Sequence, residues 1–415
     1  MNAEAGGGPL AGFTVLELGT MVAGPFCGRM LGDFGADVIK IEVPTGDPVR
    51  AMGKRVDGKS LYASSIFRNK RMASINLRDE RGRDLVRKLV EQVDVLIENF
   101  RPGTMEKWGF GYDDLAAINP GLIMVRISGF GQTGPYSQRA GYGVIGDAMS
   151  GMRHITGDPD RPPARVSVSL TDYITGLHAA YGAAMALLAR GKTGKGQCID
   201  AALYEGAFNF MEPYIPAYEK TGFIATRTGS RLPNNTPNNL FESSDGKYIH
   251  IAAVSEPTWR RLMESIGRPE ALDDPRFATL LTRAEHEDEV DAMISEWTLA
   301  HTLDDIDAVL QDAGVPASRI FTMPDVFRDP HYASRDMLVD VDDAELGTVK
   351  QANVVPKLSD TPGVIRHAGG QVGVDTRALL MERCGLDAAM VKSLEDDGVV
   401  YCGAATPDVA SETGN

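Results

Sequence analysis

Short apolar runs alternate with amphipathic stretches along the first half of the chain. Short runs bounded by glycine, aspartate or glutamate are typical of buried strands, whereas apolar residues that recur at helical spacing indicate helices. The expected strands lie at residues 13–18, 37–42, 94–98, 122–127 and 197–203, with helices near 25–34, 80–92 and 113–118. Because strands and helices alternate, the pattern predicts an α/β fold built on a parallel sheet.

One helix is expected to be longer than the others. It runs from Asp172 to about Arg190, and Gly191 and Gly194 are expected to end it, as C-terminal breakers do. Its apolar positions at helical spacing are Ile174, Leu177, Tyr181, Ala184 and Leu188.

The residue composition of the chain changes near residue 226. Proline and asparagine crowd the segment 233–239, which is typical of a crossing between domains. A strand at 248–252 is followed by acidic, helical sequence, so we expect a second, smaller domain at residues 226–325. Residues 1–225 then form the first part of a large domain, and the small, polar tail at 404–415 is expected to be flexible.

The composition is that of a globular protein with an acidic balance. Of 415 residues, 43% are hydrophobic and 24% are charged, and the net charge is -15. This balance argues against binding to nucleic acid or to an anionic membrane, because both need a basic protein surface. The N-terminus lacks the pattern of a signal peptide and no apolar run is long enough to span a bilayer, so we expect a cytoplasmic protein.

The spacing of cysteine and histidine gives no sign of a metal or disulfide site. The four cysteines form no CxxC pair, and the seven histidines show no HxxxH or HExxH spacing. We therefore expect neither a bound metal nor a disulfide framework.

A glycine-rich turn follows the first expected strand. Gly19, Gly24 and Gly28 surround the start of a helix, and Glu42 lies where a dinucleotide-binding protein has its ribose-binding acid. The glycines do not form the GxGxxG fingerprint, however, and Pro25 occupies the helix start. A structural turn that approaches some ligand closely is the favoured interpretation, and a nicotinamide oxidoreductase is the disfavoured alternative.

Basic residues cluster in the middle of the expected large domain. They are Arg68, Lys70, Arg71, Arg78, Arg101 and Lys107. Guanidinium and ammonium groups pair with phosphates, so the cluster could gather around a phosphorylated ligand. The alternative is a solvated helix face that carries Arg81, Arg83, Arg87 and Lys88. The residues alone leave both interpretations open.

Asp172 is the most informative carboxylate because it opens the long helix. Aspartate is a favoured N-cap, so capping would explain its presence without any chemistry. The same location suits a nucleophile, because the positive end of a helix favours the ionised carboxylate and backbone N–H groups there can stabilise an oxyanion. An ionised aspartate can attack an activated acyl carbon and form a covalent intermediate. The residues alone leave both roles open.

Several short motifs run collinearly from about residue 9 to 400. They include Pro9-Leu-Ala-Gly, Ala23-Gly-Pro, Leu31-Gly-Asp-Phe-Gly-Ala-Asp-Val-Ile-Lys-Ile-Glu42, Asn69-Lys-Arg, Glu98-Asn-Phe-Arg-Pro-Gly103, Gly129-Phe-Gly-Gln-Thr-Gly-Pro, Lys192-Thr-Gly-Lys-Gly-Gln, Asp274-Pro-Arg-Phe, Gly314-Val-Pro and Asp329-Pro. In this order they resemble the family III CoA-transferases, the group that includes formyl-CoA transferase, carnitine CoA-transferases and α-methylacyl-CoA racemase.

The resemblance implies a large α/β domain with a parallel sheet, built from both chain ends, so that residues 326–403 return to complete it. A smaller α+β domain is then inserted between the two parts. The family forms interlocked homodimers, which implies the same assembly here. The implied ligands are small molecules, an acyl-CoA and a carboxylate, and the coenzyme A thioester is a substrate, with no permanently bound cofactor. The catalytic aspartate of the family falls on Asp172.

Further positions match the CoA contacts of the family. They are Val22, Ala23, Ile75, Arg78, Asn99, Phe100, Arg101, Lys107, Ala140 and Tyr142. The sequence also departs from its relatives. Val22 and Val43 stand where formyl-CoA transferase has Gln and Arg, and Tyr142 stands where the racemase branch has His. The segment Gly373-Val-Asp-Thr376 replaces the family's Gly-Glu-His-Thr.

The resemblance predicts a CoA-transferase that works through an aspartyl mixed anhydride and an aspartyl-CoA thioester. Succinyl-CoA is the expected donor, and a small dicarboxylate such as mesaconate, citramalate or glutarate is the expected acceptor. A 2-methylacyl-CoA racemase is the alternative, disfavoured because Tyr142 removes one of the two proton-transfer groups that a racemase needs. A non-catalytic scaffold would instead bind CoA without turnover.

Overall fold

The computed structural model describes residues 7–403, so the tail expected to be flexible, 404–415, lies outside the described residues. Two compact units share the described chain. The first comprises residues up to 152 together with 166–216 and the segment from 334 onward, and the second comprises 153–165 and 217–333.

A seven-stranded sheet forms the centre of the first unit, in the order β14-β5-β2-β1-β6-β7-β8. Its strands are β1 (Thr14–Glu17), β2 (Asp37–Glu42), β5 (Lys70–Ile75), β6 (Val95–Glu98), β7 (Ile123–Ser128), β8 (Cys198–Ala202) and β14 (Val400–Tyr401). All neighbouring pairs are parallel except β14 with β5. The predicted α/β fold with a parallel sheet is thus confirmed.

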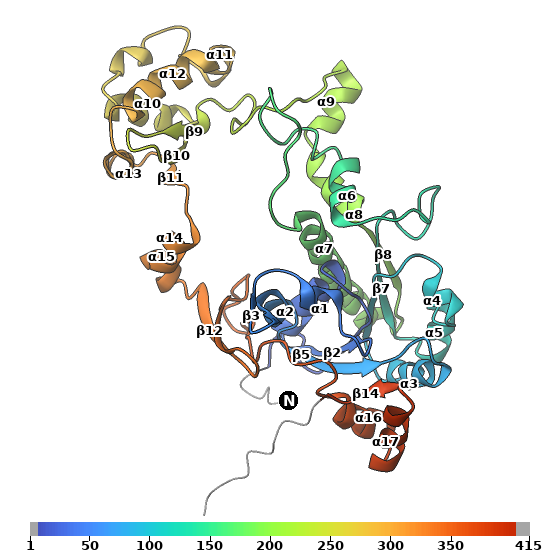
Figure 1. Cartoon of the computed structure of the whole chain (residues 1–415). Coiled ribbons are helices and arrows are strands. Elements are labelled where there is room, and N and C mark those ends of the chain that lie inside the picture. The colour runs from blue at the N-terminus through green and yellow to red at the C-terminus, as the bar shows by residue number, and fades with distance from the viewer. Residues whose placement is uncertain (1–6, 404–415) are drawn as a thin grey trace, which may run out of the picture. The chain divides into compact units, whose positions relative to one another are not determined.

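Helices cover both faces of this sheet, which explains why nearly every side chain of β1, β2 and β6 is buried. The helices on one face are α1 (Ala23–Asp33) and α7 (Leu170–Thr193), and those on the other are α3 (Glu80–Val90), α5 (Tyr112–Ile118), α16 (Thr376–Cys384) and α17 (Ala388–Asp396). Side chains alternate along each strand, so Val15 faces α1 and α7 while Leu16 faces the opposite layer. Figure 1 shows α16 and α17, in red, across the sheet from α1 and α7.

The long helix α7 begins two residues before the predicted start and continues through Gly191, while Gly194 caps its end in the left-handed conformation with φ of 71°. Its buried side is made of small residues. Gly176 lies so close to α1 that a Cβ there would be 2.8 Å from the carbonyl oxygen of Ala23. The larger residues of the predicted apolar stripe, such as Leu177 and Tyr181, are therefore on the exposed side of the helix.

The order of the strands creates a crevice between β1 and β6. From β1 the chain passes outward to β2 and β5, then returns to β6 and continues outward in the other direction through β7 and β8. The loops that leave β1 and β6 therefore diverge at their carboxyl ends. Such a reversal of strand order is where open α/β sheets bind their ligands.

The remaining elements of the first unit surround the sheet. They are η1 (Pro48–Ala51), β3 (Arg55–Val56), β4 (Lys59–Ser60), α2 (Leu61–Ile66), α4 (Thr104–Lys107), α6 (Gly143–Met149), α8 (Leu203–Phe208), η2 (Asn209–Met211), β12 (Leu338–Asp343) and β13 (Gly347–Ala352). Two helices cross the boundaries between units, namely α9 (Tyr214–Thr221) and α15 (Pro330–Ser334).

The second unit is a small α+β body. Its antiparallel sheet has the order β11-β10-β9, and helices pack around Trp259 and Leu262. Its elements are β9 (Asn238–Glu242), β10 (Tyr248–Ala252), α10 (Glu256–Ser265), η3 (Pro269–Leu272), α11 (Leu280–Glu285), α12 (Glu287–Thr298), α13 (Leu303–Asp312), β11 (Ala317–Arg319) and α14 (Met323–Arg328). Across residues 7–403, every helix is too short or too polar to cross a membrane.

Candidate active site

A cavity of about 470 Å³ lies at the carboxyl ends of β1, β6 and β7, where the strand order reverses. It contains the carboxylate-bearing residue Asp172 from the first turn of α7. The sequence-predicted residues that line it together with Asp172 are Ala23, Asn99, Phe100, Arg101, Ala140 and Tyr142. Residues as far apart in the sequence as Thr20 and Leu203 thus line one cavity.

Four of the predicted CoA contacts lie outside this cavity. Val22 is 3% exposed beneath the loop that follows β1, and Ile75 is fully buried where β5 pairs with β14. Arg78 and Lys107 are exposed, beyond the residues that line the cavity. Their proposed contacts to CoA stay predictions.

Asp172 is half-buried at the third position of α7. Ser169 occupies the N-cap position, so the capping role considered for Asp172 is wrong. A carboxylate in the first turn of a helix is still stabilised by the positive end of the helix dipole. Its side chain lies against α6, because a Cβ added to Gly143 would be 2.1 Å from Asp172 Oδ2. The glycine therefore provides the room that the carboxylate occupies.

Asn99 holds the loop that follows β1. Its Oδ1 accepts the N–H of Thr20 at 2.7 Å, and its Nδ2 donates to the carbonyl of Thr20 at 2.8 Å. The same amide lies against Gly19 and Gly24, which approach each other so closely that a Cβ on either would be 3.1 Å from the Cα of the other. The glycines of this turn thus permit a close backbone approach, and Asn99 positions the loop besides lining the cavity.

A buried charge network supports the same loop from below. Lys40 donates to the carbonyl of Gly19 and to Asp47 Oδ2, while Asp47 Oδ1 accepts the N–H of Met21 at 3.0 Å. Burial lowers the pKa of Lys40, but the charges of Glu17 and Asp47 outweigh it, so the pKa is raised above its usual value. Lys40 therefore stays protonated and keeps both hydrogen bonds.

Met21 is held in a conformation that costs energy. Its φ is +66°, in the left-handed region that non-glycine residues rarely adopt. Such a strained conformation persists where many surrounding contacts fix the backbone, and it is found most often at functional sites. The network formed by Lys40 and Asp47 was not predicted, because these two residues look like ordinary surface residues in the sequence.

The loop after β6 is fixed by a second set of ion pairs. Glu98 Oε2 accepts the N–H of Phe100 at 2.8 Å, and Arg126 donates from Nε to Glu98 Oε1 at 2.7 Å. Arg126 also donates to Glu106 Oε1 at 2.6 Å. Burial raises the pKa of Glu98 despite this arginine, whereas the hydrogen bond from Arg126 lowers the pKa of Glu106.

Two residues of the predicted basic cluster are structural. Arg68 is 1% exposed and pairs with Asp33 at 2.5 Å, and Lys70 is equally buried and pairs with Glu17 at 2.7 Å. Neither can reach a ligand in the cavity, so the interpretation of a phosphate-binding cluster is wrong for these two residues. Arg101 alone of the cluster lines the cavity.

Glu42 is also buried, and its carboxylate is paired within the protein. It is 3% exposed, pairs with Arg50 at 2.7 Å and accepts the N–H of Asp47 at 2.8 Å. A carboxylate used in this way is not available for a ribose hydroxyl, which argues further against the nicotinamide alternative.

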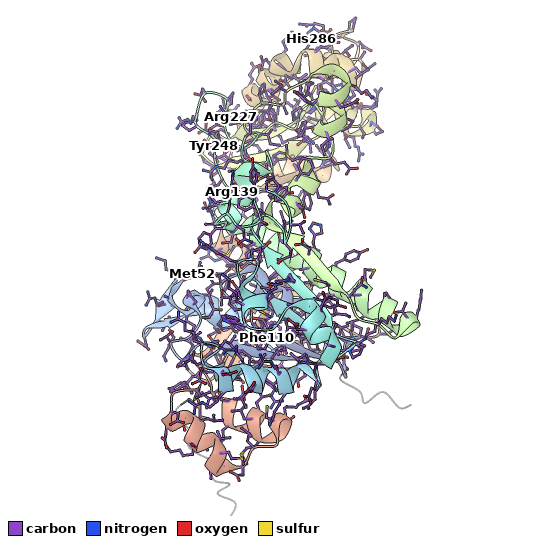
Figure 2. The ribbon with its side chains drawn as sticks, turned by 90° about the vertical axis from the view of Figure 1, so that its right-hand side faces the viewer. Met52, Phe110, Arg139, Arg227, Tyr248 and His286 are labelled. Carbon is purple, nitrogen blue, oxygen red and sulfur yellow. The ribbon has the colours of Figure 1, made fainter. Side chains whose placement is uncertain are left out.

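Arg139 lines the cavity and was missed by sequence reasoning. It lies in the segment between β7 and α6, and its guanidinium carbon is 3.5 Å from the centroid of the Tyr136 ring. Arg139 precedes α6 in the chain and is labelled in Figure 2. Its position shortly after the Gly129–Pro135 motif and three residues before Tyr142 was the available signal.

Comparison with known proteins agrees with these features. The model of CoA-transferase family III matches residues 10–376. The chain is 47% identical to a succinyl-CoA–D-citramalate CoA-transferase of Chloroflexus aurantiacus, covering 93% of this chain and 97% of that protein. It is 38% identical to a succinate–glutarate CoA-transferase of Agrobacterium fabrum, covering 90% and 95% of the two chains.

A solved structure of a CaiB/BaiF family protein from Brucella suis has the same fold. It superposes with a TM-score of 0.81 at 37% sequence identity, covering 92% of this chain and all of that one. The family model and these relatives span nearly the whole sequence. The chain therefore belongs to CoA-transferase family III and is a CoA-transferase.

Proposed function

We propose that this enzyme transfers CoA from succinyl-CoA to a small dicarboxylic acid, with Asp172 as the nucleophile. The observation that carries the proposal is that the Asp172 carboxylate lies in one cavity with the loops that follow β1, β6 and β7. The names of the similar transferases, which act on citramalate and glutarate, support succinyl-CoA and a dicarboxylate as the substrates.

In the first half of the proposed reaction, an Asp172 oxygen attacks the carbonyl carbon of the donor thioester. The carbon–sulfur bond breaks, which leaves an aspartyl–acyl mixed anhydride and a CoA thiolate. The thiolate then attacks Cγ of Asp172. The anhydride bond breaks at this carbon, the donor acid leaves as its carboxylate, and Asp172 becomes an aspartyl-CoA thioester.

The second half reverses these steps with the acceptor. The acceptor carboxylate attacks Cγ of the aspartyl thioester and expels the CoA thiolate, which forms a new mixed anhydride. The thiolate attacks the acyl carbon of the acceptor, so that the acceptor leaves as its CoA thioester and Asp172 regains its carboxylate. The cycle takes up and releases no net proton. Water must be kept from Cγ, because both covalent intermediates hydrolyse.

The fixed loops suit CoA for a physical reason. Thr20, Met21 and Ala23 present a backbone that Asn99 and Lys40 hold in place, so a ligand meets a preformed wall. We assign Ala23, Asn99, Phe100, Arg101, Ala140 and Tyr142 as contacts of the CoA chain near the thioester. Arg78 and Lys107, which are exposed, are assigned to the more distant parts of the CoA binding surface. Val22 and Ile75 are assigned as backbone contacts, because their side chains are buried.

An interlocked homodimer is part of the proposal. The outer side of α7 carries apolar side chains that the single chain leaves uncovered: Leu177 is 50% exposed, Tyr181 63% and Leu188 64%. A large uncovered apolar surface is typical of an interface between subunits. A second copy of the chain is the partner that the family resemblance implies.

Mass spectrometry tests the proposal directly. The protein is incubated with succinyl-CoA and a panel of carboxylic acids, and formation of a new acyl-CoA from a dicarboxylate is the expected result. Hydroxylamine traps the aspartyl thioester as a hydroxamate, which is expected on the peptide that contains Asp172. The D172N variant keeps the size of the side chain and should form neither product. Undiminished exchange by D172N would contradict the proposal.

The racemase alternative is not favoured. The relatives compared above are named as CoA-transferases, and Tyr142 lines the cavity where the racemase branch has a histidine. A racemase would exchange the α-hydrogen of a 2-methylacyl-CoA with solvent deuterium, and we expect no such exchange.

A further inference from the structure

Two arginines line the cavity, and neither has a carboxylate partner within the described part of the chain. Among residues 7–403, the guanidinium groups of Arg101 and Arg139 take part in no ion pair and no hydrogen bond. Elsewhere in the same unit, Arg50 pairs with Glu42 and Arg68 with Asp33. In a chain with a net charge of -15, two uncommitted cations in one cavity indicate that the ligand brings negative charge of its own.

Arg139 is ordered by stacking. Its guanidinium carbon is 3.5 Å from the centroid of the Tyr136 ring, so one face of the guanidinium is covered by an aromatic ring. Stacking fixes the plane of the group but leaves the N–H donors along its edge available. A planar edge with parallel donors matches a carboxylate in the bidentate geometry.

The location of Arg139 connects it with the reacting end of the substrate. The segment from Arg139 through Tyr142 continues directly into Gly143, whose backbone lies against the Asp172 carboxylate. Arg101, in contrast, follows Asn99 and Phe100 in the loop after β6, next to the loop after β1. Of the two cavity-lining arginines, which have no ion pair among residues 7–403, Arg139 is thus the one on the segment that adjoins Asp172.

A dicarboxylic substrate needs such a partner. When one carboxyl carbon is joined to CoA or to Asp172, the other carboxylate remains ionised, and it enters a cavity that must exclude water. An ionised carboxylate without a partner in such a place costs far more than a paired one. While the acyl group is still joined to CoA, the cavity also holds the negative charge of Asp172, which would repel the free carboxylate unless a cation were present.

We propose that Arg139 binds the free carboxylate of the dicarboxylic acyl group and thereby selects dicarboxylic over monocarboxylic substrates. This inference rests on the proposed function, because it assigns a substrate-recognition role within that reaction. Arg139 is a specificity residue in this assignment, and the covalent chemistry stays with Asp172.

Two CoA donors of similar size separate this role from binding of CoA itself. Succinyl-CoA carries a free carboxylate and butyryl-CoA carries a methyl group in its place. In R139Q we expect kcat/KM for succinyl-CoA to fall roughly 10- to 150-fold, as for the loss of hydrogen bonds to a charged group. The value for butyryl-CoA should change by less than about threefold. Where butyryl-CoA turns over too slowly, its inhibition constant against succinyl-CoA gives the same comparison.

R139K and R335Q are the matched variants. R139K keeps the charge but loses the planar edge, so it should recover part of the preference for succinyl-CoA. Arg335 is exposed and does not line the cavity, so R335Q should behave as the wild type. Because Arg139 is itself exposed, R139Q should keep the thermal midpoint of the wild type.

The outcomes distinguish the possible failures. Equal losses for both donors in R139Q would show that Arg139 binds the CoA portion, and unchanged kinetics would show that it binds neither, so either result would overturn the inference. Failure of the wild type to transfer CoA from succinyl-CoA to any acid would instead overturn the proposed function.

Discussion

The backbone of Gly143 lies against the carboxylate of Asp172, so that a Cβ added to Gly143 would be 2.1 Å from Asp172 Oδ2 and 2.8 Å from its Cγ. Gly143 is the first residue of α6 and has an ordinary helical backbone, which alanine can adopt. Glycine at this position therefore leaves the space that the Asp172 carboxylate occupies.

Replacing Gly143 by alanine should displace the Asp172 carboxylate and slow transfer. Because a shift of about 1 Å in a reacting group can cost up to roughly 100-fold in rate, we expect kcat to fall about 10- to 100-fold in G143A. KM for the CoA donor should change less, since the loops after β1 and β6, which line other parts of the cavity, are not touched. Steady-state kinetics with succinyl-CoA and an accepted dicarboxylate measure both constants.

Gly191 provides the control for this substitution. It lies inside α7, and a Cβ there would meet no atom within 4 Å. G191A should leave kcat unchanged and raise stability by about 0.5–1 kcal/mol, because alanine is the better helix former. A G143A enzyme with wild-type kcat would contradict the assigned role of the Gly143–Asp172 contact.

Removing the Asn99 amide should loosen the loop after β1. N99A loses the two hydrogen bonds to Thr20, which we expect to lower the free energy of unfolding by about 1–3 kcal/mol. The loop that lines the cavity is then held less firmly, so KM for the CoA donor should rise and kcat should fall. Chemical denaturation and steady-state kinetics measure the two effects.

Asn119 makes a comparable set of bonds away from the cavity. Its Nδ2 donates to the carbonyls of Val90 and Val93 at 2.9 and 2.8 Å. N119A should lose similar stability and keep the wild-type kinetics. If N99A and N119A had the same kinetics, Asn99 would have a structural role alone.

The parallel sheet and the helix of Asp172 could be predicted because their signals are local. Apolar runs and helical spacing depend on neighbours in the sequence, and the strand at 37–42 was predicted with the bounds of β2. β5 was not predicted, because Lys70 and Arg71 at its start look like surface residues. Lys70 is buried only because Glu17, 53 positions away in the sequence, neutralises it.

The supporting parts of the candidate site were also hidden for this reason. The loop after β1 is held by Asn99 across 79 positions and by Asp47 across 26 positions. Pairs of this kind follow from the strand order, which no single segment encodes. The exposed position of Leu177 and Tyr181 was missed because apolar spacing gives the period of a helix but does not distinguish the side that packs on the sheet.

Glu106 should give the stability of the protein a measurable pH dependence. The hydrogen bond from Arg126 holds the pKa of Glu106 below its ordinary value of 4.5. A carboxylate whose pKa is lower in the folded state stabilises the fold above its unfolded pKa, and this contribution is lost as pH falls through the folded pKa. E106Q should therefore be less stable than the wild type at pH 7, by about 0.2–1 kcal/mol because the pair is partly solvated.

The difference between E106Q and the wild type should shrink as pH falls below about 4.5. Urea denaturation between pH 7 and pH 4, or the lowest pH at which both proteins fold, measures it. A stability difference that stays constant across this range would mean that the Glu106 charge contributes nothing, and that the substitution acts through packing.

The exposed apolar side of α7 is expected to form the interface between two subunits. Leu177, Tyr181 and Leu188 lie on the exposed side of one helix while its small residues pack on α1 and the sheet. If a second copy covers this side, a charge placed in its centre is desolvated without a partner, which costs several kcal/mol in the assembled state. Light scattering should report a dimer for the wild type and a monomer or unfolded protein for Y181E.

Leu281 is the control for the dimer prediction, because it is 75% exposed but lies in α11 of the small unit. L281E should keep the dimer and the transfer activity. Y181F, which keeps the ring, should also remain dimeric. A wild-type protein that is monomeric at micromolar concentration, or a Y181E variant that is as dimeric as L281E, would show that this side of α7 is not the subunit interface.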